Sequence, residues 1–152
     1  MSFRLEYQTV ARCKPEHVWQ KFAKLEQWSW WLPVIGQTKW LQGQPWQKGS
    51  RFSMELVRPV HKTLQPVILE AATPNKLGWV GTSFGFRGEH WFSFEAQADG
   101  TTVLKTWEDS SGLLTALMSA KLKADLLSMH KEWLESLKSE AEKVAREELA
   151  RS

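Results

Sequence analysis

The last part of the chain, from Leu113 to Ser152, contains neither glycine nor proline. Its apolar residues recur at helical spacing and form one stripe: Leu122, Leu126, Met129, Trp133, Leu137, Ala141 and Val144. This pattern predicts a long amphipathic helix, because a stripe of this width is typical of a helix that packs on a core. We expect this helix to begin near Gly112, with Ser110 or Ser111 as its N-cap. We also expect a break near Lys121, where the apolar stripe changes phase. A helix of 30 residues is about 45 Å long and needs a large partner surface.

The rest of the chain mostly alternates between apolar and polar residues, which is typical of half-buried strands. We expect strands at residues 2–12, 37–43, 51–57, 64–73, 76–82, 89–98 and 102–110. Two short helical segments, 13–25 and 26–36, separate the first strand from the second, and Pro15 suits the first turn of the first segment. Pro66 lies within the predicted strand 64–73 and indicates an edge or a bulge.

This order of elements predicts an α+β fold, in which a seven-stranded antiparallel sheet curves around the C-terminal helix. A sheet buries one long helix only if it wraps around it. We treat residues 1–152 as one domain, a size that suits a single core. A curved sheet that grips a helix can leave an interior space, and apolar walls would suit it to an apolar ligand.

Four glycines, at positions 78, 81, 85 and 88, raise the question of a phosphate-binding loop. Such a loop needs closely spaced glycines followed by a helix whose N-terminus faces the anion. Here a strand follows Gly88, with His90, Phe92 and Phe94 on alternate positions. We therefore interpret residues 82–86 as a hairpin connection with Gly85 at a positive φ, and we exclude the phosphate site.

Composition and charge narrow the function classes further. The net charge is only +3 and the basic residues are scattered, so we expect no nucleic-acid partner. The lone Cys13 is expected to be a packing residue, and the sequence shows neither a signal core nor an apolar stretch long enough to span a membrane. We expect a cytoplasmic protein without stable membrane insertion. The sequence has ten Trp and one Tyr, which is more Trp than a core of this size usually holds. Some of them either line a cavity and its mouth or are ordinary core and surface packing residues.

Several local motifs, in this order, resemble the START-related helix-grip superfamily, and within it the polyketide cyclase/dehydrase and lipid transport (SRPBCC) group. They are "PEHVWQKFAKLEQWSWW", "KLGWVG", "GEHWFSFEAQADGTTVL" and "SGLL", and the similarity extends over essentially the whole chain. The resemblance implies a seven-stranded sheet wrapped on a C-terminal helix around a hydrophobic cavity. It also implies binding of lipids, polyketides or other apolar molecules. It carries no catalytic residue and no cofactor, because the group has no shared catalytic motif.

The period-two rule and the helical stripe together select the residues expected to line this cavity. They are Phe52, Met54, Leu56, Leu77, Trp79, His90, Phe92, Phe94, Leu117, Leu122, Leu126 and Met129. The alternative is that the same residues fill a solid core. Trp28, Trp30 and Trp31 cluster where the short helices should cross the mouth, as a gate or as a protein-binding patch.

His90 stands out as a polar ring among aromatic neighbours, either as a satisfied structural histidine or as a group that orients a ligand. The facing of Glu70 and Glu108 cannot be assigned from the pattern. A buried carboxylate at either position would be a candidate general acid. The other histidines are far apart in the sequence without ligand spacing, so no metal site is predicted, and Ser93 lacks the context of a nucleophile.

The leading hypothesis is a protein, without enzymatic activity, that binds or transports a small hydrophobic ligand in an internal cavity. Two alternatives stay open: an enzyme of the cyclase/aromatase kind, with His90 or a buried Glu moving a proton, and a chaperone-associated protein-interaction module of the same fold. Neither the ligand nor the oligomeric state follows from the sequence.

Overall fold

The computed structural model describes residues 2–152 and places eight strands and three α-helices in them. The strands are β1 (Ser2–Ala11), β2 (Ile35–Gln42), β3 (Arg51–Leu56), β4 (Lys62–Leu64), β5 (Val67–Ala72), β6 (Lys76–Ser83), β7 (Phe86–Ala96) and β8 (Thr102–Ser111). The helices are α1 (Pro15–Phe22), α2 (Trp28–Trp31) and α3 (Ala120–Arg151), with 3₁₀ turns η1 (Leu25–Gln27) and η2 (Leu113–Leu117).

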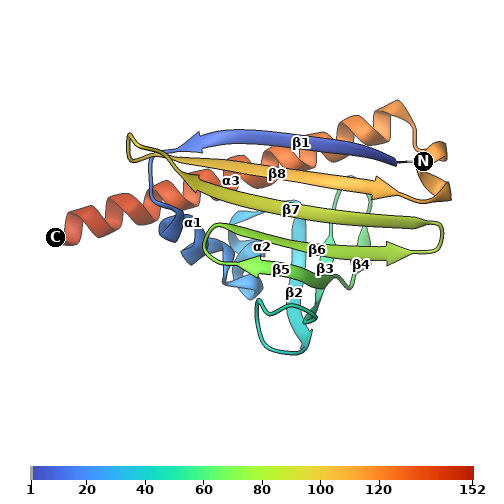
Figure 1. Cartoon of the computed structure of the whole chain (residues 1–152), viewed down its shortest axis with the longest axis horizontal. Helices are drawn as coiled ribbons and strands as arrows, with labels where there is room; N and C mark the ends of the chain where they lie inside the picture. Colours follow the sequence, from blue (N-terminus) through green and yellow to red (C-terminus); the bar gives the residue numbers. More distant parts are fainter. Residues whose placement is uncertain (1) are drawn as a thin grey trace.

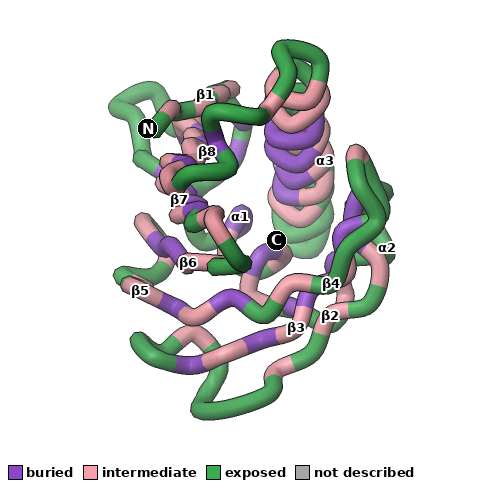
Figure 2. The backbone as a smooth tube through the Cα atoms, turned by 90° about the vertical axis from the view of Figure 1, so that its right-hand side faces the viewer, coloured by how far each residue is buried: buried purple, intermediate pink, exposed green. Residues whose placement is uncertain are grey.

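The strands form one antiparallel sheet in the order β1-β8-β7-β6-β5-β3-β2, and β4 pairs with β3. The long strands β1 and β8 pass in front of α3 in Figure 1, with β7 and β6 following below them. Figure 2, which looks nearly along α3, shows the sheet as an arc that passes around the helix. The α+β architecture predicted from the alternation of strands and the glycine-free helix is therefore confirmed.

Two predicted boundaries differ from the structure. The predicted strand 64–73 is divided into β4 and β5 at Gln65 and Pro66, which explains the eighth strand. Pro66 has no backbone N–H to donate to a ladder, so pairing is interrupted there. The last helix begins at Ala120 rather than near Gly112, because Ser110 and Ser111 belong to β8.

The start of α3 has a different cap from the one predicted. The hydroxyl of Ser119 accepts a hydrogen bond from the backbone N–H of Leu122, at 3.0 Å. The chain leaves β8 at Gly112, whose φ of 111° favours glycine, and then makes the 3₁₀ turn η2. The predicted change near Lys121 is therefore the N-terminus of α3 itself.

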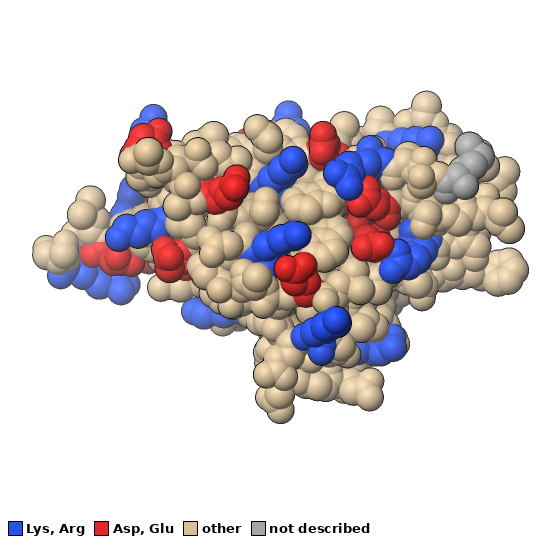
Figure 3. All heavy atoms as spheres, viewed as in Figure 1, with Lys and Arg blue, Asp and Glu red and all other residues tan. Residues whose placement is uncertain are grey.

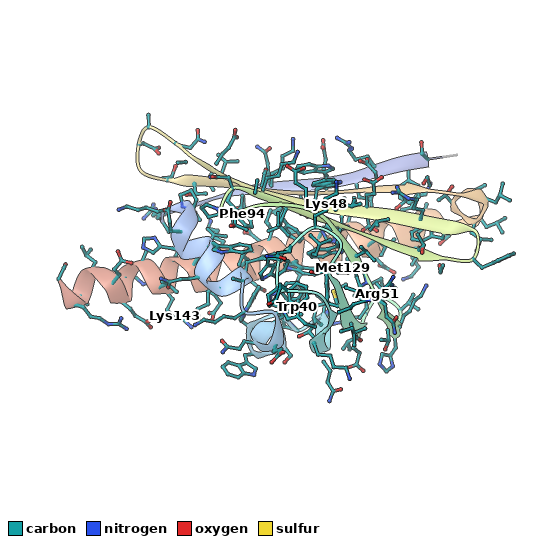
Figure 4. The ribbon with its side chains drawn as sticks, turned by 60° about the horizontal axis from the view of Figure 1, so that its bottom comes forward. Trp40, Lys48, Arg51, Phe94, Met129 and Lys143 are labelled. Carbon is teal, nitrogen blue, oxygen red and sulfur yellow. The ribbon has the colours of Figure 1, made fainter. Side chains whose placement is uncertain are left out.

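Burial changes along α3. The residues of α3 that lie deepest are Met129, His130, Trp133, Leu134, Leu137 and Ala141. Leu122 and Leu126, in the first two turns, are only half-buried although they lie on the same stripe. Figure 4 shows Met129 lying between the helix and the sheet, whereas Lys143 points away from the sheet. The sheet therefore covers the middle of the helix more completely than its first turns.

The outer face of the sheet carries charges of both signs, as Figure 3 shows for the side that faces the viewer in Figure 1. Two aromatic rings on this face, Trp91 and Trp107, stack with centroids 6.2 Å apart, and Lys76 and Lys105 lie over them. None of the helices in residues 2–152 is both long enough and apolar enough to cross a membrane.

Candidate functional site

A cavity of about 310 Å³ lies between the sheet and the first half of α3. Its wall comes from β3, β4, β6, β7, β8, η2 and α3, and the apolar part of it includes Met54, Leu56, Leu64, Trp79, Phe86, Leu114, Leu122, Leu126 and Met129. Leu114 and Val60 belong to the wall and are also exposed, so the cavity opens to solvent beside them. This volume is at the low end of the range for pockets that bind small organic molecules.

Seven of the twelve residues predicted to contact a ligand border this cavity: Met54, Leu56, Trp79, His90, Leu122, Leu126 and Met129. Four others, Phe52, Leu77, Phe92 and Phe94, point to the same side of the sheet but are fully buried in the core beyond the cavity. Alternation therefore gives the correct face, but the solid part of the core begins within the same strands. The alternative interpretation, a filled core, describes these four residues.

Leu117 was also predicted to contact the ligand, but 79% of its surface is exposed. The prediction assumed a helix that already includes residue 117, whereas this residue belongs to η2 and precedes α3. A 3₁₀ turn has three residues per turn, so the helical stripe does not extend into it.

The three Trp predicted at the mouth lie away from the wall of the cavity. Trp28 is fully buried and its indole N–H donates to the backbone oxygen of Phe22, at 2.9 Å. Trp30 is 76% exposed, and Trp31 is half-buried. The short helix α2 packs against β2, so it covers the solid part of the core and does not gate the cavity.

His90 lies at the inner end of the cavity and is held by a chain of hydrogen bonds. Its Nε2 is 2.8 Å from the hydroxyl oxygen of Thr106, which donates its own proton to the backbone oxygen of Trp91. A hydroxyl has one proton, so the Thr106 oxygen must accept from Nε2–H, which leaves the lone pair on Nδ1. Burial, and then the neighbouring His130, hold the pKa of His90 well below its usual value. His90 is therefore a neutral ring.

Glu108 and His130 form a hydrogen-bonded pair beside this ring. The Nε2 of His130 is 2.9 Å from Oε2 of Glu108, and the ring of His130 meets that of His90 edge-on, with centroids 4.6 Å apart. His130 is fully buried, whereas 17% of the Glu108 side chain is exposed. Within residues 2–152, the other ring nitrogen of His130 is buried without a hydrogen-bond partner. Glu108 thus brings a carboxylate to the cavity wall and orients His130.

The register of the β7–β8 hairpin explains why these residues meet. His90 and Glu108 are direct partners on the two strands, so both side chains point towards α3. A glycine at position 88 makes room for the carboxylate, because a Cβ there would be 2.9 Å from Oε1 of Glu108. Alternation alone left the facing of Glu108 open. The Asp99–Gly100 turn could have assigned this facing. It closes the hairpin with Gln97 opposite Thr101, and the same register pairs His90 with Glu108.

The remaining polar candidates lie elsewhere. Glu70 is on the surface, with its carboxylate 3.8 Å from the amino group of Lys76, so it is no candidate for a buried acid. Cys13 is buried, and burial, with a smaller contribution from Glu142, raises its pKa to about 11. A thiol in this state is a packing residue rather than a nucleophile.

This fold provides an apolar cavity between a curved antiparallel sheet and a C-terminal helix. A polar cluster lies at the inner end of the cavity. The sequence matches the family described as polyketide cyclase / dehydrase and lipid transport over residues 2–142. The chain therefore belongs to this family, and the predicted resemblance is confirmed. A comparison with curated proteins gives no match.

Solved structures with the same fold cover nearly the whole chain. A hypothetical protein, jhp0584 from Helicobacter pylori, has a TM-score of 0.78 at 17% identity, covering 91% of this chain and 88% of its own. The Zhui aromatase/cyclase from Streptomyces sp. R1128 has a TM-score of 0.74 at 13% identity, covering 93% and 94%. A START superfamily protein from Mycobacterium smegmatis has a TM-score of 0.69 at 14% identity, covering 95% and 97%. At these identities the similarity shows the fold alone.

Proposed function

We propose that this protein binds or transports a small hydrophobic molecule in the cavity between α3 and the sheet. The observation that carries the proposal is the cavity of about 310 Å³ with its largely apolar wall, in a family described by lipid transport and polyketide cyclisation. Each Å² of apolar ligand surface removed from water contributes about 25 cal/mol, so burial would supply most of the affinity. His90 and Glu108, at the inner end, would orient a polar group of the ligand.

The residues proposed to contact the ligand are those of the predicted set that border the cavity. Met54 and Leu56 contribute from β3 and Trp79 from β6, while Leu122, Leu126 and Met129 contribute from α3. Because Leu122 and Leu126 are half-buried without a ligand, they offer apolar surface that a ligand would cover. The cavity volume suits a molecule of one or two rings or a short acyl chain rather than a two-chain lipid.

Gly81 offers a direct way to test the cavity. It borders the cavity, and a Cβ built there meets no atom within 4 Å, so a larger side chain has room to enter the hollow. We expect Gly81→Leu to abolish binding of an apolar fluorescent probe such as anilinonaphthalene sulfonate while the fold persists. Val80→Leu, at the next position of the same strand with its side chain on the opposite face, is the matched control and should leave binding unchanged.

Native mass spectrometry of the freshly purified protein complements this titration. We expect an apolar molecule bound to the wild type and to Val80→Leu, and absent from Gly81→Leu. Equal probe affinity in wild type and Gly81→Leu, with both folded, would rule out this cavity as the binding site.

The second candidate function is an enzyme of the cyclase kind, and the cluster of His90, Glu108 and His130 favours it. A neutral imidazole beside a cavity can remove a proton from a carbon between two carbonyls, and the proton shared by the neighbouring His130–Glu108 pair can be given to oxygen. Turnover of a poly-β-carbonyl thioester analogue to a cyclic, ultraviolet-absorbing product, lost in His90→Gln, would support this function. Binding of the analogue without turnover would leave the protein as a carrier.

A further inference from the structure

Three side chains from three elements converge at the inner end of the cavity. One ligand atom from each of His90 on β7, Glu108 on β8 and His130 on α3 lies within 4.8 Å of the other two. We propose that these residues form a binding site for a divalent transition-metal ion, with Zn²⁺ as the type case, and that one coordination position faces the cavity. The proposed apolar ligand is not needed for this site.

The donor set fits the chemistry of such an ion. Two imidazole nitrogens and one carboxylate oxygen are typical ligands of zinc sites that keep a position open for water or substrate. Calcium and magnesium favour all-oxygen ligand sets, so this cluster does not suit them. Since His90 and Glu108 line the cavity, the open position would be directed to its interior.

His90 is already held in the orientation that a ligand requires. Metal-binding histidines usually donate their second N–H to an acceptor that fixes the ring. Here Thr106 accepts from Nε2–H because its own proton goes to the backbone oxygen of Trp91. The side-chain hydrogen bond of His90 to the part of the chain that the structure describes is made by Nε2, which leaves the Nδ1 lone pair unused. This nitrogen is therefore available for coordination.

His130 supplies an independent indication. The residue is fully buried, and its Nδ1 has no hydrogen-bond partner in residues 2–152. Buried polar atoms almost always have a partner, so an orphan nitrogen beside two other ligand groups needs an explanation. A metal ion in the three-residue site would take the place of the proton between Nε2 of His130 and Oε2 of Glu108, so that both atoms become ligands.

The movement that binding requires is small. Ligand atoms 2.0 to 2.2 Å from a tetrahedral zinc ion lie about 3.4 Å from one another. The pair of His130 and Glu108 already has an N···O distance of 2.9 Å, and the widest separation in the cluster is at most 4.8 Å. A contraction of at most about 1.4 Å is within the reach of side-chain rotations.

Two other His–Glu pairs in the chain serve as matched controls. His17 is 2.9 Å from Glu148, and His61 is 2.8 Å from Glu55. Neither pair belongs to a group of three potential ligands within residues 2–152. The second nitrogen of His17 also accepts from the backbone N–H of Lys14, so it is not free for a metal.

The test is a titration of the metal-free chain with Co²⁺, followed by its visible d–d bands, and with Zn²⁺ in a calorimeter, without any apolar ligand. We expect one ion per chain and the intense absorption of a low-symmetry, four- or five-coordinate Co²⁺ site. Glu108→Gln, which keeps the shape of the side chain, should abolish this site. Thr106→Val, which removes the acceptor that holds His90, should weaken the affinity about 10- to 100-fold. His17→Gln and His61→Gln should leave both stoichiometry and affinity unchanged.

The wild type gives a second measurement that does not depend on the folding of any variant. In ¹H–¹⁵N spectra of the imidazole rings, Zn²⁺ should shift the signals of His90 and His130 and leave those of His17 and His61 in place. Absence of a stoichiometric site, or shifts confined to His17 and His61, would overturn the proposal. Because the titration uses no apolar ligand, such a result would leave the proposed carrier function untouched.

Discussion

The two ends of the interface between α3 and the sheet differ, although the same strands and the same helix form both. Near α1 and α2 the interface is solid, because each of four rings contacts two of the others: Phe22, Trp28, Phe92 and Trp133. Near η2 and β4 the interface encloses the cavity, with Leu126 half-buried at its wall. Figure 2 shows α3 within the arc of strands that provides both ends.

The difference comes from what covers each end. At the solid end, α1 and α2 insert aromatic side chains between the sheet and the helix, and Trp46 and Trp40 extend the cluster from β2 and the loop after it. Figure 4 shows Trp40 on this side of the molecule. At the hollow end the interface is covered by a 3₁₀ turn, a three-residue strand and the loops beside them. These short elements carry too few side chains to fill the space between the curved sheet and α3. A cavity therefore remains at this end.

The largest expected effect is at the solid end. Phe92 is fully buried and contacts the rings of Phe22 and Trp133, so Phe92→Ala would leave a void that the packed rings cannot close. We expect a loss of about 3 to 5 kcal/mol in the free energy of unfolding, measured by urea denaturation. A loss below about 1 kcal/mol would mean that this end is as loosely packed as the other.

The matched substitution at the hollow end is Leu126→Ala. Because Leu126 is half-buried and faces the cavity, we expect a loss of only about 1 to 1.5 kcal/mol in the same measurement. The substitution also enlarges the cavity, so probe titrations should show a shift of preference towards bulkier apolar ligands. An effect as large as that of Phe92→Ala would contradict the contrast between the two ends.

Cys13 reports on the solid end through pH. Its pKa is raised from 9.0 to about 11, chiefly by burial, so the folded state keeps the thiol proton more firmly than the unfolded chain. The stability from this thiol is therefore fully present below pH 9 and is lost as the pH rises towards 11. We expect the wild type to lose about 1 kcal/mol more than Cys13→Ala between about pH 8 and about pH 10. Parallel urea curves for the two proteins over this range would contradict a buried, protonated thiol.

The smallest effect is expected for Leu117→Ser, because this side chain is mostly exposed on η2. The free energy of unfolding should change by less than about 0.5 kcal/mol. The affinity for the apolar probe should stay the same, in contrast to Gly81→Leu. Weaker probe binding in Leu117→Ser would mean that the hollow extends outwards over η2.

Local patterns in the sequence were enough to predict the kinds of elements and their order. Alternation predicted the strands, the absence of glycine and proline predicted α3, and Gly85 has the positive φ that was predicted for its turn. These features depend on interactions between residues close in the chain. The boundary at residue 112 was wrong, because helical spacing cannot distinguish η2 from the first turn of α3.

The depth of each side chain could not be predicted in the same way. Period two places Met54 and Phe52 on one face of β3, and His90 and Phe92 on one face of β7. Within each pair, one residue borders the cavity and the other is in the solid core. Whether a residue borders the cavity or lies in the solid core depends on α1, α2 and η2. These elements reach the interface from distant parts of the chain.

The sequence by itself therefore determined the sheet, the helix and the face that β3, β6 and β7 turn towards that helix, because neighbouring residues decide these features. Only the tertiary structure decided that one end is solid and the other hollow, and that His90, Glu108 and His130 meet. Strand register brings the first two together, while the rotation of α3 on the sheet adds the third. Both depend on the packing of the whole core, which no local pattern encodes.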